Sequence, residues 1–142
     1  MHRQDKHAIF QECRIRRTPA RLAVLNTLGD YPISAYQIAT KLKKEGVVVD
    51  LASIYRTLNL FVEHKIAHAV STGDNVQRFE LVDDSYHHHH VICYLCGDIE
   101  DIQMNETVLL KEISSKTDCR IDHHHIEFFG TCANCQKRKK KI

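Results

Sequence analysis

The chain has 142 residues, 43% of them hydrophobic and 27% charged, with six cysteines and a formal net charge of +2. This length can bury one modest core or two small ones, and because no run of about 18 apolar residues occurs, we expect no membrane span. No apolar stretch follows the charged first residues, so we also expect no signal peptide and a cytoplasmic location, where cysteines favour metal ligation over disulfides.

Three short helices are predicted in the first half of the chain from their start signals. Thr18 is an N-cap with Pro19 at the first helical position, and Ser34 with Gln37 forms a capping box. Asp50 caps a third helix, whose apolar residues recur with helical spacing. The predicted helices span about 19–28, 35–44 and 51–64.

A hairpin is predicted next, because strand-like runs at 66–70 and 76–81 enclose a turn rich in Gly, Asn and Asp. Three helices followed by a hairpin describe a winged helix-turn-helix, in which the early residues of the third helix enter the major groove of DNA. Tyr55 can there contact a thymine methyl or a phosphate, and Arg56 a guanine or a phosphate. The other candidate DNA contacts are Ser53 and, toward the backbone or minor groove, Arg14, Arg16, Arg17 and Arg21.

The charge pattern changes at a polar segment, 83–86, which we interpret as a hinge. Residues 1–82 hold 12 Lys and Arg against 8 Asp and Glu, which suits a polyanion, whereas 83–136 hold 3 against 10, which suits cations. We predict a winged-helix DNA-binding domain at 1–82, a metal-binding dimerisation domain at 87–136 and a basic tail at 137–142, with disorder confined to the chain ends.

The second domain is predicted to be a small α/β domain, so that the fold class of the whole chain is α+β. Strands are expected at about 87–93, 98–102 and 120–129, with one helix at about 105–116. So small a hydrophobic core needs a structural zinc ion and a dimer interface for stability, and we therefore predict a homodimer.

Four cysteines form two Cys-x-x-Cys pairs, which are typical of a structural zinc site: Cys93, Cys96, Cys132 and Cys135. Each two-residue spacer lets both thiolates of a pair reach one tetrahedral Zn²⁺ ion. A redox-active pair is the alternative for either motif alone, and the presence of both favours zinc. The other two cysteines, Cys13 and Cys119, are expected to be small buried residues.

Four consecutive histidines at 87–90 predict metal binding outside the cysteine site. A purification tag is the alternative, but this run is internal and continues into an apolar, strand-like segment. Successive side chains of a strand point to opposite faces, so the first and third histidines share one face and the second and fourth the other. One strand can therefore serve two metal sites. On the last predicted strand, His124 likewise points away from the histidines on either side of it.

Several segments resemble, in their order along the chain, the ferric uptake regulator (Fur) family. They are Arg17-Thr-Pro-Ala-Arg-Leu22, Ala52-Ser-Ile-Tyr-Arg-Thr-Leu58, Arg78-Phe-Glu-Leu81, His87-His-His-His-Val-Ile-Cys-Tyr-Leu-Cys-Gly97 and Ile126-Glu-Phe-Phe-Gly-Thr-Cys132. The resemblance covers residues from about 10 to 136. It implies a dimeric, metal-activated repressor with a winged-helix domain, a hinge and an α/β dimerisation domain, which binds a double-stranded DNA operator and controls metal-uptake genes.

The resemblance also implies the roles of the metal ligands, beginning with structural zinc at the four paired cysteines. Its regulatory site corresponds to Glu80, His88 and His90, with Asp101 or His68 as further ligands. A third site of many members corresponds to His87, His89 and His124. Those members often carry Glu where Thr107 stands here, and the adjoining Glu106 is the candidate in its place.

Zinc is the favoured regulatory metal, ahead of Fe²⁺, because a His-rich site with Glu80 suits Zn²⁺. Such a site also accepts Fe²⁺ or Mn²⁺, because selectivity comes from site geometry and metal availability. His68 stands where zinc sensors of the family often have a ligand, and Ile33-Ser-Ala-Tyr36 resembles that branch. Iron and peroxide sensors often supply a histidine where Pro32-Ile33 stands. Against zinc, Glu80 occupies a position where zinc sensors frequently have Cys, although a peroxide sensor would favour Asp there. An iron-, manganese- or peroxide-responsive repressor is therefore the alternative.

A zinc enzyme and a metal-storage module are the alternatives from other functional classes. A catalytic zinc site needs an open coordination position and a general base, and the chain has no His-Glu-x-x-His or deaminase-like signature. Storage would explain the histidines but not the helix-turn-helix. We therefore expect a regulator that is not an enzyme, with no small-molecule substrate and no membrane partner.

Overall fold

The computed structural model describes residues 6–83 and 87–139 and divides into two compact units. The N-terminal unit comprises the residues up to Ser71 together with Asn75–Asp83, and the C-terminal unit comprises Thr72–Asp74 and the residues from Asp84 onward. Most of the predicted hinge, 84–86, lies outside the described residues. No helix in the described ranges is long and apolar enough to cross a membrane.

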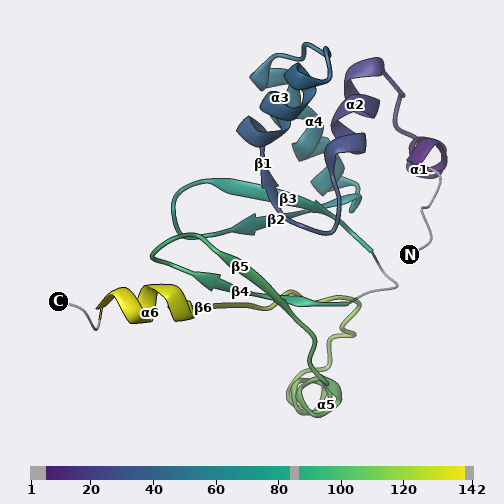
Figure 1. Cartoon of the computed structure of the whole chain (residues 1–142). Coiled ribbons are helices and arrows are strands. Elements are labelled where there is room, and N and C mark those ends of the chain that lie inside the picture. The colour runs from purple at the N-terminus through teal and green to yellow at the C-terminus, as the bar shows by residue number, and fades with distance from the viewer. Residues whose placement is uncertain (1–5, 84–86, 140–142) are drawn as a thin grey trace. The chain divides into compact units, whose positions relative to one another are not determined.

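The N-terminal unit packs helices against a small antiparallel sheet (Figure 1). Its elements are α1 (Lys6–Glu12), α2 (Pro19–Thr27), β1 (Ile33–Ser34), α3 (Ala35–Lys44), α4 (Leu51–Glu63), β2 (Ala67–Ser71) and β3 (Gln77–Leu81). The strand order is β1-β3-β2. The three predicted helices and the two strands of the predicted hairpin are confirmed, each within one residue at either end.

The start signals act as the sequence predicted. Thr18 Oγ1 accepts a hydrogen bond from the Arg21 backbone N–H at 3.2 Å and so caps α2. Ser34 and Gln37 form a reciprocal capping box, with distances of 2.8 and 3.2 Å. These bonds satisfy backbone donors that the first turn of a helix leaves without partners, and they use only residues that are near in sequence.

The core of the N-terminal unit is built around α4. Its Ile54, Leu58 and Phe61 are fully buried, together with Leu25 of α2 and Ile38 of α3. Because one face of α4 is buried in the core, the opposite face of the helix is exposed and can contact another molecule.

One helix of this unit, α1, was not predicted, because we expected disorder at the chain ends. Phe10 of α1 is buried, and its ring meets the ring of Phe61 edge-on, with 6.2 Å between the centroids. Lys6 Nζ donates to the backbone oxygens of Leu25 and Leu28, at 3.1 and 3.2 Å, and so caps the end of α2. Contacts with residues distant in sequence therefore stabilise α1, and its own sequence carries no clear start signal.

In its described residues, the C-terminal unit is a three-stranded sheet with two helices (Figure 1). Its elements are β4 (His89–Cys93), β5 (Ile99–Ile102), α5 (Thr107–Lys116), β6 (Glu127–Gly130) and α6 (Ala133–Lys139). The central strand, β4, is antiparallel to β5 and parallel to β6.

Two predictions for the C-terminal unit are wrong. The last strand begins at Glu127 instead of near residue 120, because β4 offers it only the four partners His90–Cys93. His124 therefore lies in an irregular segment, 121–126, and the alternation of a strand does not apply to it. Disorder at the end of the chain is also incorrect for 137–139, which form the last turn of α6.

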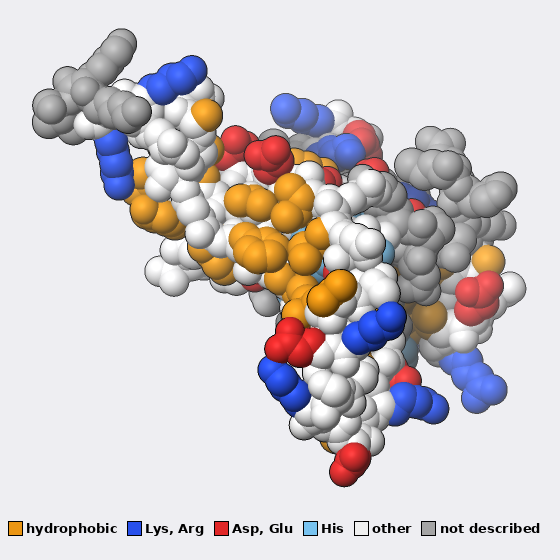
Figure 2. Space-filling model, turned by 90° about the horizontal axis from the view of Figure 1, so that it is seen from below, with side chains coloured by type: hydrophobic (Ala, Val, Ile, Leu, Met, Phe, Trp, Pro, Cys, Tyr) orange, Lys and Arg blue, Asp and Glu red, His pale blue; other side chains and the backbone are white. Residues whose placement is uncertain are grey.

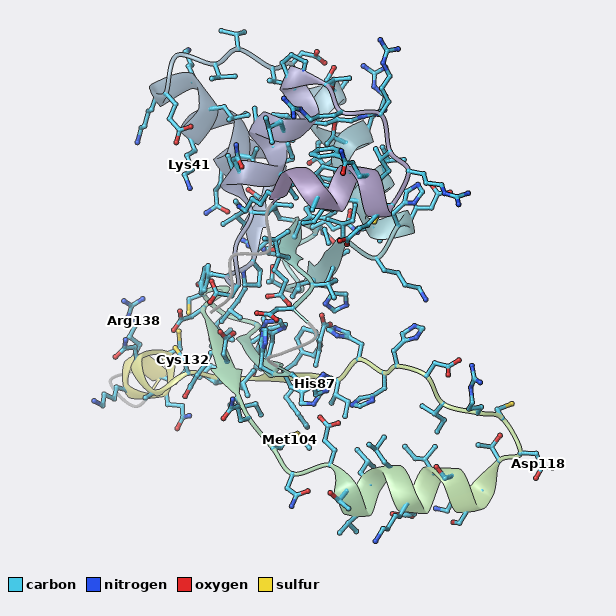
Figure 3. All side chains as sticks on the ribbon, turned by 90° about the vertical axis from the view of Figure 1, so that its right-hand side faces the viewer. Lys41, His87, Met104, Asp118, Cys132 and Arg138 are labelled. Atoms are coloured by element: carbon cyan, nitrogen blue, oxygen red, sulfur yellow. The ribbon has the colours of Figure 1, made fainter. Side chains whose placement is uncertain are left out.

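Helix α5 lies apart from the sheet of its own unit, between the labelled Met104 and Asp118 in Figure 3. It has no buried residue, and its Val108 and Ile113 are 77% and 39% exposed. Phe128 and Phe129 of β6 are 41% and 52% exposed. Figure 2 shows hydrophobic side chains gathered on one face of the molecule. An amphipathic helix without a partner in its own unit needs one elsewhere.

Candidate metal centres and the DNA-reading helix

The four paired cysteines converge at one end of the C-terminal sheet. Cys93 ends β4, Cys96 lies in the turn after it, Cys132 precedes α6 and Cys135 lies within α6. Their sulfurs all lie within 4.8 Å of one another, and the Cys96 and Cys132 sulfurs are 3.7 Å apart. All four are free thiols. Figure 3 shows sulfur atoms gathered near the labelled Cys132.

These sulfurs fit a tetrahedral zinc ion. Zn–S bonds of about 2.3 Å place the sulfurs of a tetrahedron about 3.8 Å apart, close to the separation observed between Cys96 and Cys132. The Cys132 backbone N–H donates to Cys93 Sγ at 3.4 Å and lowers the pKa of that thiol to about 6. The Cys132 side chain, by contrast, raises the pKa of Cys135 to about 12. A dication would offset the repulsion that keeps all four from ionising together.

A second cluster gathers three histidines around one carboxylate. Glu106 contacts the Nε2 atoms of His87, His89 and His124, and its distance to His87 is 3.1 Å. The Nε2 atoms of His87 and His124 are 3.2 Å apart. The neighbouring Thr107 is exposed and does not join the cluster. Glu106, the candidate named in place of Thr107, therefore lies with the three histidines.

The chemistry of this cluster also suits a metal ion. His89 is 1% exposed, and burial lowers its pKa, which favours the neutral imidazole that can ligate a metal. Zn–N bonds of about 2.0–2.1 Å place the nitrogens of a tetrahedron about 3.3 Å apart, close to the distance between the nitrogens of His87 and His124. Three ring nitrogens and one buried carboxylate are a donor set that can hold a metal ion.

The remaining predicted ligands lie in two sets, one in each unit. In the N-terminal unit, His68 of β2 pairs with Glu80 of β3, and His68 Nδ1 is 3.6 Å from a Glu80 carboxylate oxygen. In the C-terminal unit, the rings of His88 and His90 are in edge contact, with 5.0 Å between their centroids. His90 Nε2 is 3.4 Å from an Asp101 carboxylate oxygen. The two histidines of the second set lie apart from the Glu106 cluster, as the alternation of the run suggests.

Sequence reasoning missed Glu127 as a neighbour of these ligands. Glu127 pairs in register with His90, and its carboxylate lies 2.9 Å from His125 Nε2. Only the pairing of β6 with β4 brings Glu127 to this position, and the sequence has no signal for that pairing.

The two cysteines outside the zinc cluster also differ from expectation, since Cys13 is only partly buried and Cys119 is exposed.

The predicted DNA-reading residues lie at the start of α4. Arg56 is exposed, and Ser53 is half-buried. Tyr55 is half-buried and packs partly against the core, so only part of its ring is available to DNA. In the segment before α2, Arg21 donates from Nη1 to the backbone oxygen of Arg16 at 2.7 Å. This bond orients one arginine of the predicted backbone-contacting group.

A family model and a curated relative both match most of the chain. Residues 12–129 match the model of the Ferric uptake regulator family. A curated relative, the peroxide-responsive repressor PerR of Staphylococcus aureus strain Mu50, is 30% identical over 139 residues, which cover 95% of this chain and 92% of the relative.

Solved structures give the same fold. The ferric uptake regulator of Vibrio cholerae aligns with a TM-score of 0.76 at 27% identity, covering 90% of this chain and 100% of that one. A zinc uptake regulator complexed with zinc and DNA aligns with a TM-score of 0.60 at 24% identity, covering 94% of this chain and 92% of that one. The similarity to the zinc uptake regulator, at 24% identity, shows only that the two proteins share a fold.

Proposed function

This chain belongs to the ferric uptake regulator family of metal-dependent transcriptional repressors, and we propose that zinc is the metal to which it responds. The observation that supports the proposal is the His68–Glu80 pair, in which an imidazole nitrogen lies 3.6 Å from a carboxylate oxygen in the hairpin of the N-terminal unit. Imidazole suits zinc well, although it also binds iron and other metals. The genes that the protein controls would then be those of zinc uptake.

The proposed regulatory ligands come from both units: His68, Glu80, His88, His90 and Asp101. We propose that both sets bind the same ion. A divalent cation bound there would supply the charge that allows two carboxylates and neutral histidines to share one site. His68 and Glu80 belong to the hairpin that follows α4, so their coordination would restrain the DNA-reading helix relative to the dimerisation unit.

The proposed switch requires the metal to bind the DNA-competent form of the dimer more tightly than the other form. To change a dimer from 1:99 to 99:1 in favour of the DNA-competent form, the metal must prefer that form by about 5.5 kcal/mol. Restraint would hold the two winged helices of a dimer at a spacing that matches successive major grooves. Metal binding therefore acts on DNA affinity through geometry, in addition to reducing the negative charge of the acidic part of the chain.

The exposed apolar surface of the C-terminal unit supports assembly as a dimer. Members of this family bind DNA and act as dimers. Here four large apolar side chains on α5 and β6 are exposed: Val108, Ile113, Phe128 and Phe129. We propose that a second copy of the chain covers them, because burial of apolar surface would stabilise a unit whose own core is thin.

The Glu106 cluster is proposed as a third metal site. Its four side chains come from β4, the segment preceding it, the start of α5 and the irregular segment 121–126. A bound ion would therefore tie α5 to the sheet of its unit. Because α5 carries two of the exposed apolar side chains, Val108 and Ile113, this site would affect the stability of the dimer more than the metal response.

A mobility-shift titration tests the choice of metal. Protein without metal at the proposed regulatory site, but still holding zinc at the four cysteines, is titrated with Zn²⁺, Fe²⁺ and Mn²⁺ in turn on the promoter region of its own gene. Zinc is expected to produce the shift at the lowest free metal concentration, and excess chelator should reverse it. A shift at lower free Fe²⁺ or Mn²⁺ would favour the iron-, manganese- or peroxide-responsive alternative. No metal-dependent shift with any of the three would contradict the proposed mechanism.

A second prediction concerns Arg56, the exposed arginine at the start of α4. Arg56→Ala should cost roughly 1–3 kcal/mol of operator binding if the guanidinium reads a base, and should also lower the salt dependence if it contacts a phosphate. Fluorescence anisotropy at several salt concentrations measures both effects. Unchanged operator affinity in a folded, metal-loaded variant would place the recognition surface elsewhere.

A further inference from the structure

The guanidinium of Arg56 is held by a chain of hydrogen bonds that begins at the N-cap of α4. Asp50 Oδ1 accepts from the Ser53 backbone N–H at 2.9 Å, which is the ordinary capping bond. The second carboxylate oxygen, Oδ2, accepts from the Ser53 hydroxyl at 2.6 Å. Ser53 Oγ in turn accepts from Arg56 Nη2 at 3.1 Å.

The direction of this chain follows from the single proton of a hydroxyl group. Ser53 donates its proton to the Asp50 carboxylate, so the lone pairs of Ser53 Oγ are available to the guanidinium. An ionised carboxylate enforces this order because it can only accept hydrogen bonds. The side-chain hydrogen bond from Ser53, and after it the backbone bond from Ser53, lowers the pKa of Asp50 and so favours the ionised carboxylate.

Resting on the proposed DNA-binding function, we propose that Asp50 is a positioning residue that sets the base specificity of Arg56 through Ser53. Arg56 has many rotamers, and the bond to Ser53 restricts them before DNA is bound. The nearby negative charge also weakens the attraction of Arg56 for phosphates of any sequence. Both effects favour the operator over non-specific DNA.

Asp50 as an N-cap alone is the competing explanation, and Asp50→Asn separates the two. Asparagine caps a helix about as well as aspartate, so α4 should remain intact. Its amide nitrogen, however, would donate to Ser53 Oγ where the carboxylate oxygen accepts. The hydroxyl acceptor would then be shared between Asn and Arg56, and the negative charge would be lost.

The experiment selects DNA from a randomised duplex pool with full-length, Zn²⁺-loaded protein. Wild type, Asp50→Asn, Ser53→Ala and Arg56→Ala are each used for selection, and the enriched sequences give a base preference at every position. The affinity of each protein is then measured for the duplex that wild type enriches and for a scrambled duplex of the same composition. Glu63→Gln is the matched control, because Glu63 is an exposed acid at the other end of α4.

Asp50→Asn and Ser53→Ala should relax base preference at the same positions as Arg56→Ala. Their ratio of affinities for enriched and scrambled duplexes should fall about threefold to tenfold, the effect of one exposed charge-assisted hydrogen bond. Combining Asp50→Asn with Ser53→Ala should add little to either change alone, because both break the same chain. Glu63→Gln should leave base preference unchanged.

Three results would overturn the proposal. Unchanged base preference in Asp50→Asn would show that Asp50 serves only as the N-cap of α4. The proposed metal-dependent DNA binding of the wild-type protein would not be affected by that result. An equal change in Glu63→Gln would assign the effect to net charge. Failure of wild type to enrich any sequence at saturating Zn²⁺ would instead contradict the proposed function itself, and the role of Asp50 with it.

Discussion

Replacing both His88 and His90 with Ala should abolish metal-dependent operator binding while leaving the thiolate zinc, the dimer and the fold intact. These two histidines are in ring contact, and His90 adjoins Asp101, so the double variant removes the imidazoles that the C-terminal unit supplies to the proposed regulatory site. In the proposed site, Asp101 would then be the one remaining ligand from the C-terminal unit. The measurement is operator affinity with and without Zn²⁺, together with zinc content and sedimentation.

The matched control also replaces two histidines with Ala, but at the neighbouring positions of the run. His87→Ala with His89→Ala removes two ligands of the Glu106 cluster, which is separate from the pair at positions 88 and 90. This variant should keep at least part of the metal response and should weaken the dimer, because the cluster includes the residue that precedes α5. Equal loss of metal-dependent binding in both double variants, with fold and dimer preserved, would show that the four histidines act as one site.

Cys93→Ser should remove the structural zinc and destabilise the C-terminal unit. A serine hydroxyl does not ionise as a thiolate does, and Cys93 is the cysteine whose pKa is lowered to about 6 by the Cys132 backbone N–H. Structural zinc contributes on the order of 10 kcal/mol to the folding of small metal-dependent domains. Loss of even about 3 kcal/mol would lower the melting temperature by on the order of 10 °C.

Cys119→Ser provides the control for this change, because Cys119 is an exposed thiol outside the zinc cluster. It should leave zinc content and melting temperature as in wild type. Zinc content is measured by elemental analysis and unfolding by calorimetry, under reducing conditions for both variants. A Cys93→Ser protein that retains a full complement of zinc and an unchanged melting temperature would contradict the four-cysteine site.

The sequence alone was sufficient where the determining contacts are local. Helices α2, α3 and α4 begin where Thr18, Ser34 and Asp50 predicted, because a cap bonds to an amide only three residues away. The cysteine spacing is equally local, since two thiolates separated by two residues can bind one ion. The alternation of the histidine run follows from the geometry of an extended chain.

Tertiary structure was needed wherever the partner lies far along the chain. Helix α1 was missed because Phe61 and the end of α2 hold it, and the last strand was predicted to begin seven residues too early because its length depends on pairing with β4. The family resemblance had named Glu106 as the candidate in place of Thr107, but only the packing of distant segments brings Glu106 to His87, His89 and His124. Capping and spacing are fixed by bonds between neighbours, whereas pairing register and ligand convergence depend on which distant segments pack together.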